Sequence, residues 1–285
     1  SETLLRNVDA ALYRAKADGR GTFRFFAAEM DDQLQARRRL VQDLRLAIPR
    51  GELVLHYQPF INSRSGSITG CEALLRWNHP ERGMIPPHEF IPIAEESGLI
   101  VEIGAWVIHE ACRQAASWPP EQRVSVNVSP LQFRHRDLIG TIGAALTDSG
   151  LPPARLELEV TETVLICDAE GALDTLKQIR SLGVKVALDD FGTGYSSLSY
   201  LRAFPFDKIK IDKSFVDDLA VRQDNQIIVQ AIRDIAQGLG MSITAEGVET
   251  AEQASHLRQT GCHELQGYLF SKPKPPEDLR FETNG

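Results

Sequence analysis

From residue 52 onward the chain alternates short β-rich runs with helical stretches, and no other sequence feature restricts the possible folds as strongly. Runs typical of strands lie at 53–60, 68–77, 123–129, 155–162, 185–191, 208–212, 242–248 and 264–270. Helical patterns lie between most of them, at 88–118, 134–149, 169–182, 196–203, 224–239 and 250–260. This alternation indicates an α/β protein with parallel strands and crossover helices, and eight strands predict a modified TIM (β/α)8 barrel.

The first two predicted strands are an exception to the parallel arrangement. Only residues 62–67 separate them, which is too short for a crossover helix, so we expect one antiparallel strand near the start. The barrel domain is expected to span residues 50–285, preceded by a connecting helix over 27–49. Residues 1–26 contain one helical stripe and one strand-like run, which are too little to bury a core of their own.

Composition argues against several classes of protein. With 31 Lys+Arg against 39 Asp+Glu the net charge is −8, which disfavours a broad surface for DNA or RNA duplexes. The four cysteines are far apart and form no CxxC pair, which disfavours a zinc cluster or a disulfide framework. No apolar run approaches the roughly 18 residues that span a bilayer, and no basic-then-apolar leader opens the chain.

Polar and acidic side chains gather on the predicted strands and at their ends. In a barrel the carboxyl ends of the strands converge on one face, which is where active sites form. The polar residues in these places are Glu72, Asn127, Glu159, Glu162, Asp189, Asp190, Lys210, Asp212, Glu246, Glu249 and Gln266. Five or more carboxylates around one mouth repel each other, so either several are protonated or divalent cations neutralise them.

The available ligands favour a hard divalent cation. Carboxylates and an amide oxygen, without Cys or His, suit Mg²⁺ or Mn²⁺. The adjacent Asp189 and Asp190 would let one carboxylate bridge two ions, and two ions would clamp the oxygens of an in-line phosphoryl displacement. Lys210 would then hold or orient the attacking hydroxide. These residues alone indicate a metal-dependent barrel enzyme.

The same residues also have structural interpretations. An acid at a strand end can cap the following helix, and Lys210 can be the salt-bridge partner of a neighbouring acid. The glycine-rich segment after Asp189 and Asp190 is compatible with a plain turn, and it lacks the third glycine of a dinucleotide-binding fingerprint. Capping does not account for all of the strand-end acids together.

Eight short motifs occur together along the chain. They are YQP (57–59), EALLRW (72–77), NVS (127–129), EVTE (159–162), DDFGTGYS (189–196), KID (210–212), EGVE (246–249) and QGY (266–268). On these motifs the chain resembles, over roughly residues 40–280, the EAL-domain family of bacterial phosphodiesterases, which hydrolyse cyclic di-GMP to linear pGpG. Residues 4–26 resemble the C-terminal end of a GGDEF domain without its signature string. The resemblance therefore implies no cyclase activity here, and GGDEF and sensor domains upstream in a longer protein.

The resemblance implies a role for each motif residue. The implied ligands of one Mg²⁺ or Mn²⁺ are Glu72, Asn127, Glu159 and Asp189, and those of the second are Asp189, Asp190 and Glu246. The implied catalytic group is Lys210, which would contact the water, with Glu72, Glu246 and Glu249. The implied substrate contacts are Gln58, Arg76, Asp212 and Gln266, with the Arg76 guanidinium on a phosphate. Glu162 would brace the loop 191–197.

Two other hypotheses remain at this point. A cyclic di-GMP receptor would bind the ligand without hydrolysing it, although every metal-ligand position of the family is present here. A different metal-dependent barrel enzyme, such as a lyase or isomerase, would act on another substrate. The family also implies a homodimer and a cytoplasmic location for this domain, with any membrane tether supplied by sequence outside this chain.

Overall fold

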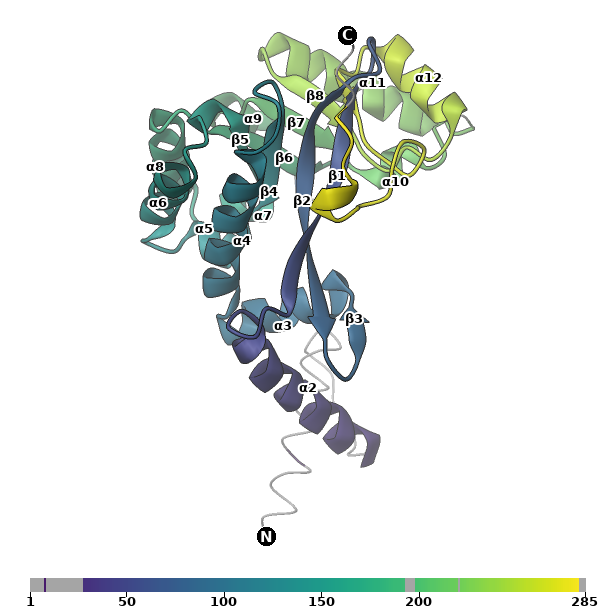
Figure 1. The fold of residues 1–285 in the computed structure, drawn as a ribbon. Coiled ribbons are helices and arrows are strands. Elements are labelled where there is room, and N and C mark those ends of the chain that lie inside the picture. The colour runs from purple at the N-terminus through teal and green to yellow at the C-terminus, as the bar shows by residue number, and fades with distance from the viewer. Residues whose placement is uncertain (1–7, 9–27, 193–197, 220, 282–285) are drawn as a thin grey trace. The chain divides into compact units, whose positions relative to one another are not determined.

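The computed structural model describes residues 8, 28–192, 198–219 and 221–281 (Figure 1). The expected GGDEF-like segment, residues 1–26, lies outside the described residues apart from Val8. The chain forms two compact units, residues 1–52 with 77–99 and residues 53–76 with 100–285. No helix in the described ranges is both long and apolar enough to cross a membrane.

The first unit contains α2 (Ala28–Ala47), the end of β2 (Ile68–His79), β3 (Gly83–Ile85) and α3 (Pro87–Ser97). β3 pairs antiparallel with the last residues of β2, so that Trp77 lies opposite Ile85. Trp77 is fully buried and lies edge-on to Phe90 of α3, with 5.6 Å between the ring centroids. Its indole Nε1 donates a hydrogen bond of 3.0 Å to Glu52. The Trp77 side chain therefore connects the β2–β3 hairpin, α3 and Glu52, the last residue of the segment 1–52.

The second unit contains a closed barrel of eight strands. In spatial order they are β1 (Leu53–Asn62), β9 (Glu264–Leu265), β8 (Ser242–Ala245), β7 (Lys208–Ile211), β6 (Lys185–Phe191), β5 (Leu156–Thr161), β4 (Arg123–Asn127) and β2, which pairs again with β1. β1 runs antiparallel to β9, and the other pairs from β2 round to β9 are parallel. The expected modified TIM barrel with one antiparallel strand is confirmed, and β3 is an addition to the predicted strands.

The helices of this unit lie outside the ring of strands (Figure 1). They are α4 (Ile100–Ala115), α5 (Pro130–Phe133), α6 (Leu138–Ser149), α7 (Thr163–Cys167), α8 (Ala169–Ser181), α9 (Leu198–Ala203), α10 (Lys213–Val216), α11 (Gln223–Gly238) and α12 (Ala251–Thr260), with 3-10 turns at Pro153–Arg155 and Pro276–Asp278. The single helix predicted over 88–118 is two helices, because Gly98 ends α3 with a left-handed φ of 78°. The short helices α7 and α10 follow β5 and β7 closely and are also additions to the prediction.

The barrel strands alternate apolar residues on the helix side with polar residues on the inside. In β4, Val124 and Val126 are buried apolar residues, whereas Arg123 and Ser125 bond to side chains of other strands across the interior. The sequences of β5 (LELEVT) and β7 (KIKI) repeat this pattern. Branched apolar side chains usually fill a TIM-barrel interior, so the charged interior of this barrel needs its own electrostatic explanation.

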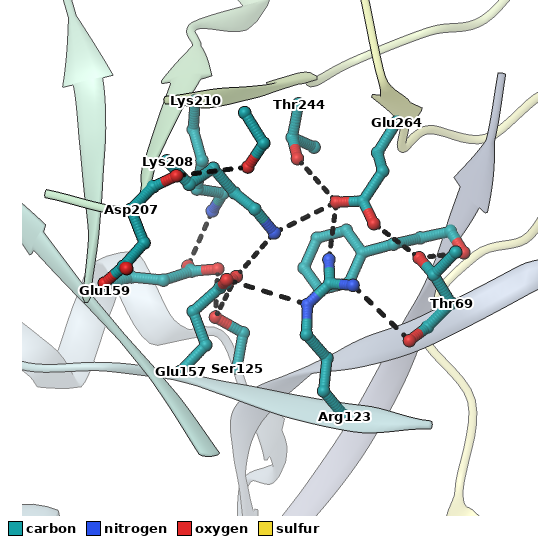
Figure 2. Close-up of polar contacts among 12 residues, drawn as sticks. Thr69, Arg123, Ser125, Glu157, Glu159, Asp207, Lys208, Lys210, Thr244 and Glu264 are labelled. Atoms are coloured by element: carbon teal, nitrogen blue, oxygen red, sulfur yellow. Dashed lines mark hydrogen bonds and ion pairs between the residues drawn. The ribbon is translucent and has the colours of Figure 1, made fainter. Parts of the chain in front are cut away.

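Four charged residues near the starts of the strands form what we call the lower ionic layer: Arg123, Glu157, Lys208 and Glu264 (Figure 2). Lys208 Nζ lies 2.8 Å from Glu157 Oε1 and 2.9 Å from Glu264 Oε2, and the Arg123 guanidinium donates to Glu264. Burial alone would raise the pKa of both carboxyls, but Lys208 and Arg123 outweigh burial and lower both pKa values. The lower ionic layer is therefore an ionised set in which two positive charges balance two negative charges.

β6 leaves regular strand geometry near its end. Its pairing with β7 shifts register between Leu188 and Phe191, which marks a bulge. Asp190 in this bulge has a φ of 53°, in the left-handed region that non-glycine residues rarely occupy. In a regular strand Asp189 and Asp190 would point to opposite faces. Burial and then repulsion from Asp189 raise the pKa of Asp190.

The lower ionic layer predicts acid sensitivity. Because the folded-state pKa values of Glu157 and Glu264 lie below the ordinary value of 4.5, their stabilisation is present above that pH and is lost as the pH falls. Glu264→Gln leaves Lys208 and Arg123 short of one carboxylate. At neutral pH it should lower the free energy of unfolding by about 3–5 kcal/mol. It should also flatten the decline of that free energy as the pH falls below 4.5.

Urea unfolding at a series of pH values measures both effects. Glu96→Gln is the matched control, since Glu96 is 61% exposed and pairs with Arg37 at 2.6 Å on the surface of the first unit. An exposed pair contributes little, so this variant should unfold like the unchanged protein. Equal stability of the Glu264→Gln and Glu96→Gln variants would contradict the role given to the lower ionic layer.

The bulge predicts an unusual order of stabilities at Asp190. Asp190→Gly and Asp190→Ala remove the same carboxylate, so the difference between them reports the backbone alone. The glycine variant should be more stable by about 1–2 kcal/mol, because a left-handed φ crowds the alanine Cβ. At Asp174, which is exposed within α8, the order should reverse, because glycine is the poorer helix former. Denaturant unfolding of the four variants measures this, and an alanine variant at 190 as stable as the glycine variant would refute the left-handed conformation.

Candidate active site

The carboxyl ends of the strands bring together five carboxylates and one amine. We call this set the upper ionic layer: Glu72 on β2, Glu159 on β5, Asp189 and Asp190 on β6, Lys210 on β7, and Glu246 directly after β8. Lys210 Nζ lies 2.6 Å from Glu159 Oε2, 3.3 Å from Asp189 Oδ1 and 3.9 Å from Glu72 Oε2, and it contacts Glu246 Oε1. The lysine is 1% exposed. Residues predicted from separate strands thus surround one buried amine.

The upper ionic layer carries far more negative than positive charge. Its formal charge is −4 when all of its groups are ionised. Burial, followed by repulsion from Glu72, raises the pKa of Glu159 well above its usual range. Burial also raises the pKa of Glu246 and outweighs the attraction of Lys210. For Lys210, burial would lower the pKa, but the surrounding carboxylates reverse this effect and raise it. The lysine therefore stays protonated, yet one ammonium does not balance the acids.

Three amide side chains form a hydrogen-bonded chain around Glu72. Asn127 Nδ2 donates to Glu72 Oε1 at 2.7 Å, and Gln266 Nε2 donates to Glu72 Oε2 at 2.7 Å. The Gln266 amide nitrogen also donates to Gln58 Oε1 at 3.2 Å, and Gln58 Nε2 donates to the backbone oxygen of Ser271 at 3.0 Å. The structure therefore brings the predicted residues Asn127, Gln58 and Gln266 to the same place as Glu72.

Two predicted residues after β7 and β8 have their own surface partners. Asp212 is the N-cap of α10, and its Oδ1 accepts a hydrogen bond of 3.0 Å from the backbone N–H of Ser214. The capping interpretation thus holds for Asp212, which still lies near enough to Asp190 to raise its pKa. Glu249 is 45% exposed and pairs with Lys213 at 2.6 Å. Neither carboxylate contacts Lys210.

The remaining two predicted residues border the layer. Arg76 lies near the C-terminal end of β2, and its guanidinium donates a hydrogen bond of 2.9 Å to the backbone oxygen of Leu75. Partial burial lowers the pKa of Arg76, although Tyr268 and then Glu72 act in the opposite direction. Glu162 is buried, and its Oε1 accepts a hydrogen bond of 3.1 Å from the backbone N–H of Gly192. The predicted brace to the loop 191–197 thus includes a contact to Gly192, and residues 193–197 lie outside the described residues.

A support for the loop after β8 was missing from the predicted residues. Gln253 is buried and accepts hydrogen bonds from the backbone N–H groups of Glu249 and Thr250 at 2.8 and 2.9 Å. Its Nε2 donates to the backbone oxygen of Val216 at 3.1 Å, which ties this loop to α10. The sequence signal was available, because Thr250 and Gln253 have the spacing of a capping box, and the structure forms that box.

The donor set fits hard divalent cations. Its atoms are carboxylate and amide oxygens, which Mg²⁺ and Mn²⁺ prefer, and two such ions would supply the four positive charges that the upper ionic layer lacks. Asp189 Oδ1 and Glu246 Oε1 are buried beside the Lys210 ammonium, and within the described part of the chain no further hydrogen-bond donor reaches them. In that same part, no group of three acidic, histidine or cysteine side chains is already arranged to hold a metal ion. The ammonium of Lys210 lies between the carboxylates instead.

Comparison with known proteins identifies close relatives. Residues 41–273 match the family model of the EAL domain. The chain is 45% identical over 280 residues to the bifunctional diguanylate cyclase/cyclic di-GMP phosphodiesterase MucR of Pseudomonas aeruginosa, covering 97% of this chain and 41% of that protein. It is 44% identical over 278 residues to the cyclic di-GMP phosphodiesterase PdeR of Escherichia coli, covering 96% of this chain and 42% of that protein.

The fold has a close counterpart among solved structures. The PaMucR phosphodiesterase in complex with c-di-GMP superposes with a TM-score of 0.82 at 46% identity, covering 85% of this chain and 100% of that chain. The chain spans 33–42% of the length of the first curated relatives it matches. The family model covers most of the barrel and all of the upper ionic layer. The chain therefore belongs to the EAL domain family.

Proposed function

We propose that this chain hydrolyses cyclic di-GMP to linear pGpG in a reaction that needs two divalent cations, Mg²⁺ or Mn²⁺. The observation that carries the proposal is the upper ionic layer, which places five carboxylates and one lysine at the carboxyl ends of the strands in an EAL barrel. A phosphodiester is anionic, so this face receives one only when bound cations reverse its charge. The relative whose structure holds c-di-GMP supports the choice of substrate.

The metal ligands are assigned from the resemblance to the EAL family, at residues that the structure brings close to one another. We assign the first ion to Glu72, Asn127, Glu159 and Asp189, and the second to Asp189, Asp190 and Glu246. The Asn127 amide has its nitrogen on Glu72, and a rotation about its last bond would present its oxygen. When bound, the two ions would lower the pKa of a water molecule and neutralise charge on the phosphate.

The other residues of the face would bind and orient. Lys210, fixed among the carboxylates, would hold the attacking water by hydrogen bonding. The guanidinium of Arg76 would bind a phosphate oxygen pair, which its planar fork fits. Gln58 and Gln266 already bond to each other and would place the substrate next to Glu72.

Three predicted residues would act from the border of the site. Asp212 caps α10 and would contact the substrate from there. Glu249 would contribute to catalysis through its ion pair with Lys213 and not as a metal ligand, since it lies outside the upper ionic layer. Glu162 would brace the start of the loop 191–197 through Gly192.

The arrangement of the longer protein is part of the same proposal. Residues 50–285 would be the phosphodiesterase domain and 27–49, most of which form α2, the connecting helix. Residues 1–26 would be the end of a GGDEF-like domain, on the resemblance of 4–26 alone. Dimerisation and a cytoplasmic site of action, where cyclic di-GMP is found, are proposed from the family.

The proposed activity predicts a metal-dependent product. Purified chain incubated with cyclic di-GMP and Mg²⁺ or Mn²⁺ should yield pGpG on chromatography, and the same mixture with EDTA should not. Tight binding of intact substrate in both metals would identify a receptor instead. Absence of both binding and turnover would overturn the substrate assignment and favour a different metal-dependent barrel enzyme.

The upper ionic layer predicts a severe effect of Glu72→Gln. This change keeps the size of the side chain but removes a charge at the proposed first ion. Turnover should fall by more than about 100-fold, beyond the range seen when only a partner of a ligand is lost. Glu252→Gln, on the exposed first turn of α12, is the control and should keep full activity. Initial rates of pGpG formation measure the difference, and normal turnover by Glu72→Gln would refute the metal assignment.

A further inference from the structure

A serine lies between the two ionic layers, inside the barrel. Ser125 of β4 is completely buried. Its Oγ lies 2.6 Å from Glu159 Oε1 in the upper layer and 3.4 Å from Glu157 Oε1 in the lower layer (Figure 2). A hydroxyl has one proton to donate, so the shorter contact, to Glu159, is the strong hydrogen bond.

The strand pairing explains why this one hydroxyl reaches both layers. In the parallel register, Ser125 lies opposite Glu157 on β5, and Glu159 is two residues further along the same face of that strand. A side chain at position 125 is therefore level with the lower layer and directed toward the upper one. Serine is short enough to fit there and carries the donor that Glu159 needs.

The two oxygens of Glu159 have different partners. Oε2 accepts from Lys210 at 2.6 Å, on the side of the carboxylate cluster. Oε1 accepts from Ser125, on the side of the barrel interior. Glu159 is 1% exposed, so water does not replace either partner. The hydroxyl thus fixes the rotation of the carboxylate and leaves a single oxygen directed at the cluster.

We infer that Ser125 is a positioning residue that makes Glu159 a one-oxygen metal ligand. The inference rests on the proposed function, because it concerns the ions that the reaction needs. Ser125 touches neither substrate nor ion and acts through Glu159. Without the hydroxyl, Oε1 would be buried with no donor, and the carboxylate would lose the contact that fixes its orientation.

The test compares the affinity for Mn²⁺ itself in the full chain without substrate. Isothermal titration calorimetry of Ser125→Ala should show Mn²⁺ binding about 10- to 100-fold weaker than in the unchanged protein, the range for losing a partner of a metal ligand. Ser125→Thr, which keeps the hydroxyl, should restore binding. If the alanine variant does not fold, Ser125→Cys keeps the volume with a weak donor and should weaken binding in the same direction.

Thr244→Val is the matched control. Thr244 is also completely buried in the barrel interior, but its hydroxyl donates to Glu264 of the lower layer at 3.0 Å. A purely structural role of buried hydroxyls predicts that both variants lose stability and bind Mn²⁺ alike. The inference predicts that Thr244→Val binds Mn²⁺ like the unchanged protein. Equal weakening in Thr244→Val, or unchanged binding in Ser125→Ala, overturns it.

Kinetics separate this inference from the proposed function. Ser125→Ala should lower kcat for cyclic di-GMP and leave KM within about twofold, because the serine does not touch the substrate. If the unchanged protein makes pGpG and Ser125→Ala binds Mn²⁺ normally, only the inference fails. If the unchanged protein makes no pGpG but Ser125→Ala still weakens Mn²⁺ binding, the proposed function fails and the inference stands. If the unchanged protein binds no Mn²⁺, both fail.

Discussion

The ammonium of Lys210 is the interaction on which the mouth of this barrel depends. It lies 2.6 Å from Glu159 and 3.3 Å from Asp189, with Glu72 and Glu246 also in range, and almost no solvent reaches it. A lysine buried to this extent would ordinarily lose its proton. Here the acids keep it charged, while it offsets only part of their mutual repulsion. The strands must therefore close into a ring tight enough to hold these side chains together, and the parallel register from β2 to β9 does so.

Below this set, the barrel solves the same electrostatic problem in a different way. The lower ionic layer pairs two cations with two anions, whereas the upper ionic layer has five carboxylates and a single ammonium. Ser125 bonds to Glu159 of the upper layer and lies close to Glu157 of the lower layer. The interior thus changes along the barrel axis from a charge-balanced ionic core to an acidic site, which we propose to bind cations. The starts of the strands thus hold the residues assigned to stability, and their carboxyl ends hold the residues assigned to the proposed chemistry.

Much of this could be predicted from the sequence, and the failures have physical causes. The eight strands, the antiparallel β1 and the strand-end acids follow from local patterns of polarity and spacing, and the motifs identify the family. The end of α3 at Gly98 was not predicted, because a glycine within an apolar helical pattern is also compatible with a continuous helix. The left-handed Asp190 depends on how β6 meets β7, which no local pattern reports. The residues of the lower ionic layer could have been suspected from the sequence, since LELEVT and KIKI alternate charged with apolar residues. Which of these charges come into contact depends on the closure of the barrel, which the sequence pattern does not report.

The two ionic layers differ in charge balance, and this difference affects how such a barrel can evolve. Because the lower layer balances its own charges, it does not depend on the acids at the mouth. Loss of one of those acids would relieve repulsion and still leave Lys210 with carboxylate partners. Selection for turnover alone keeps such an arrangement intact, as in other sites where function is maintained against stability. Once that selection is relaxed, a lineage could drift from catalyst to ligand-binding module through single substitutions, with the architecture preserved at every step.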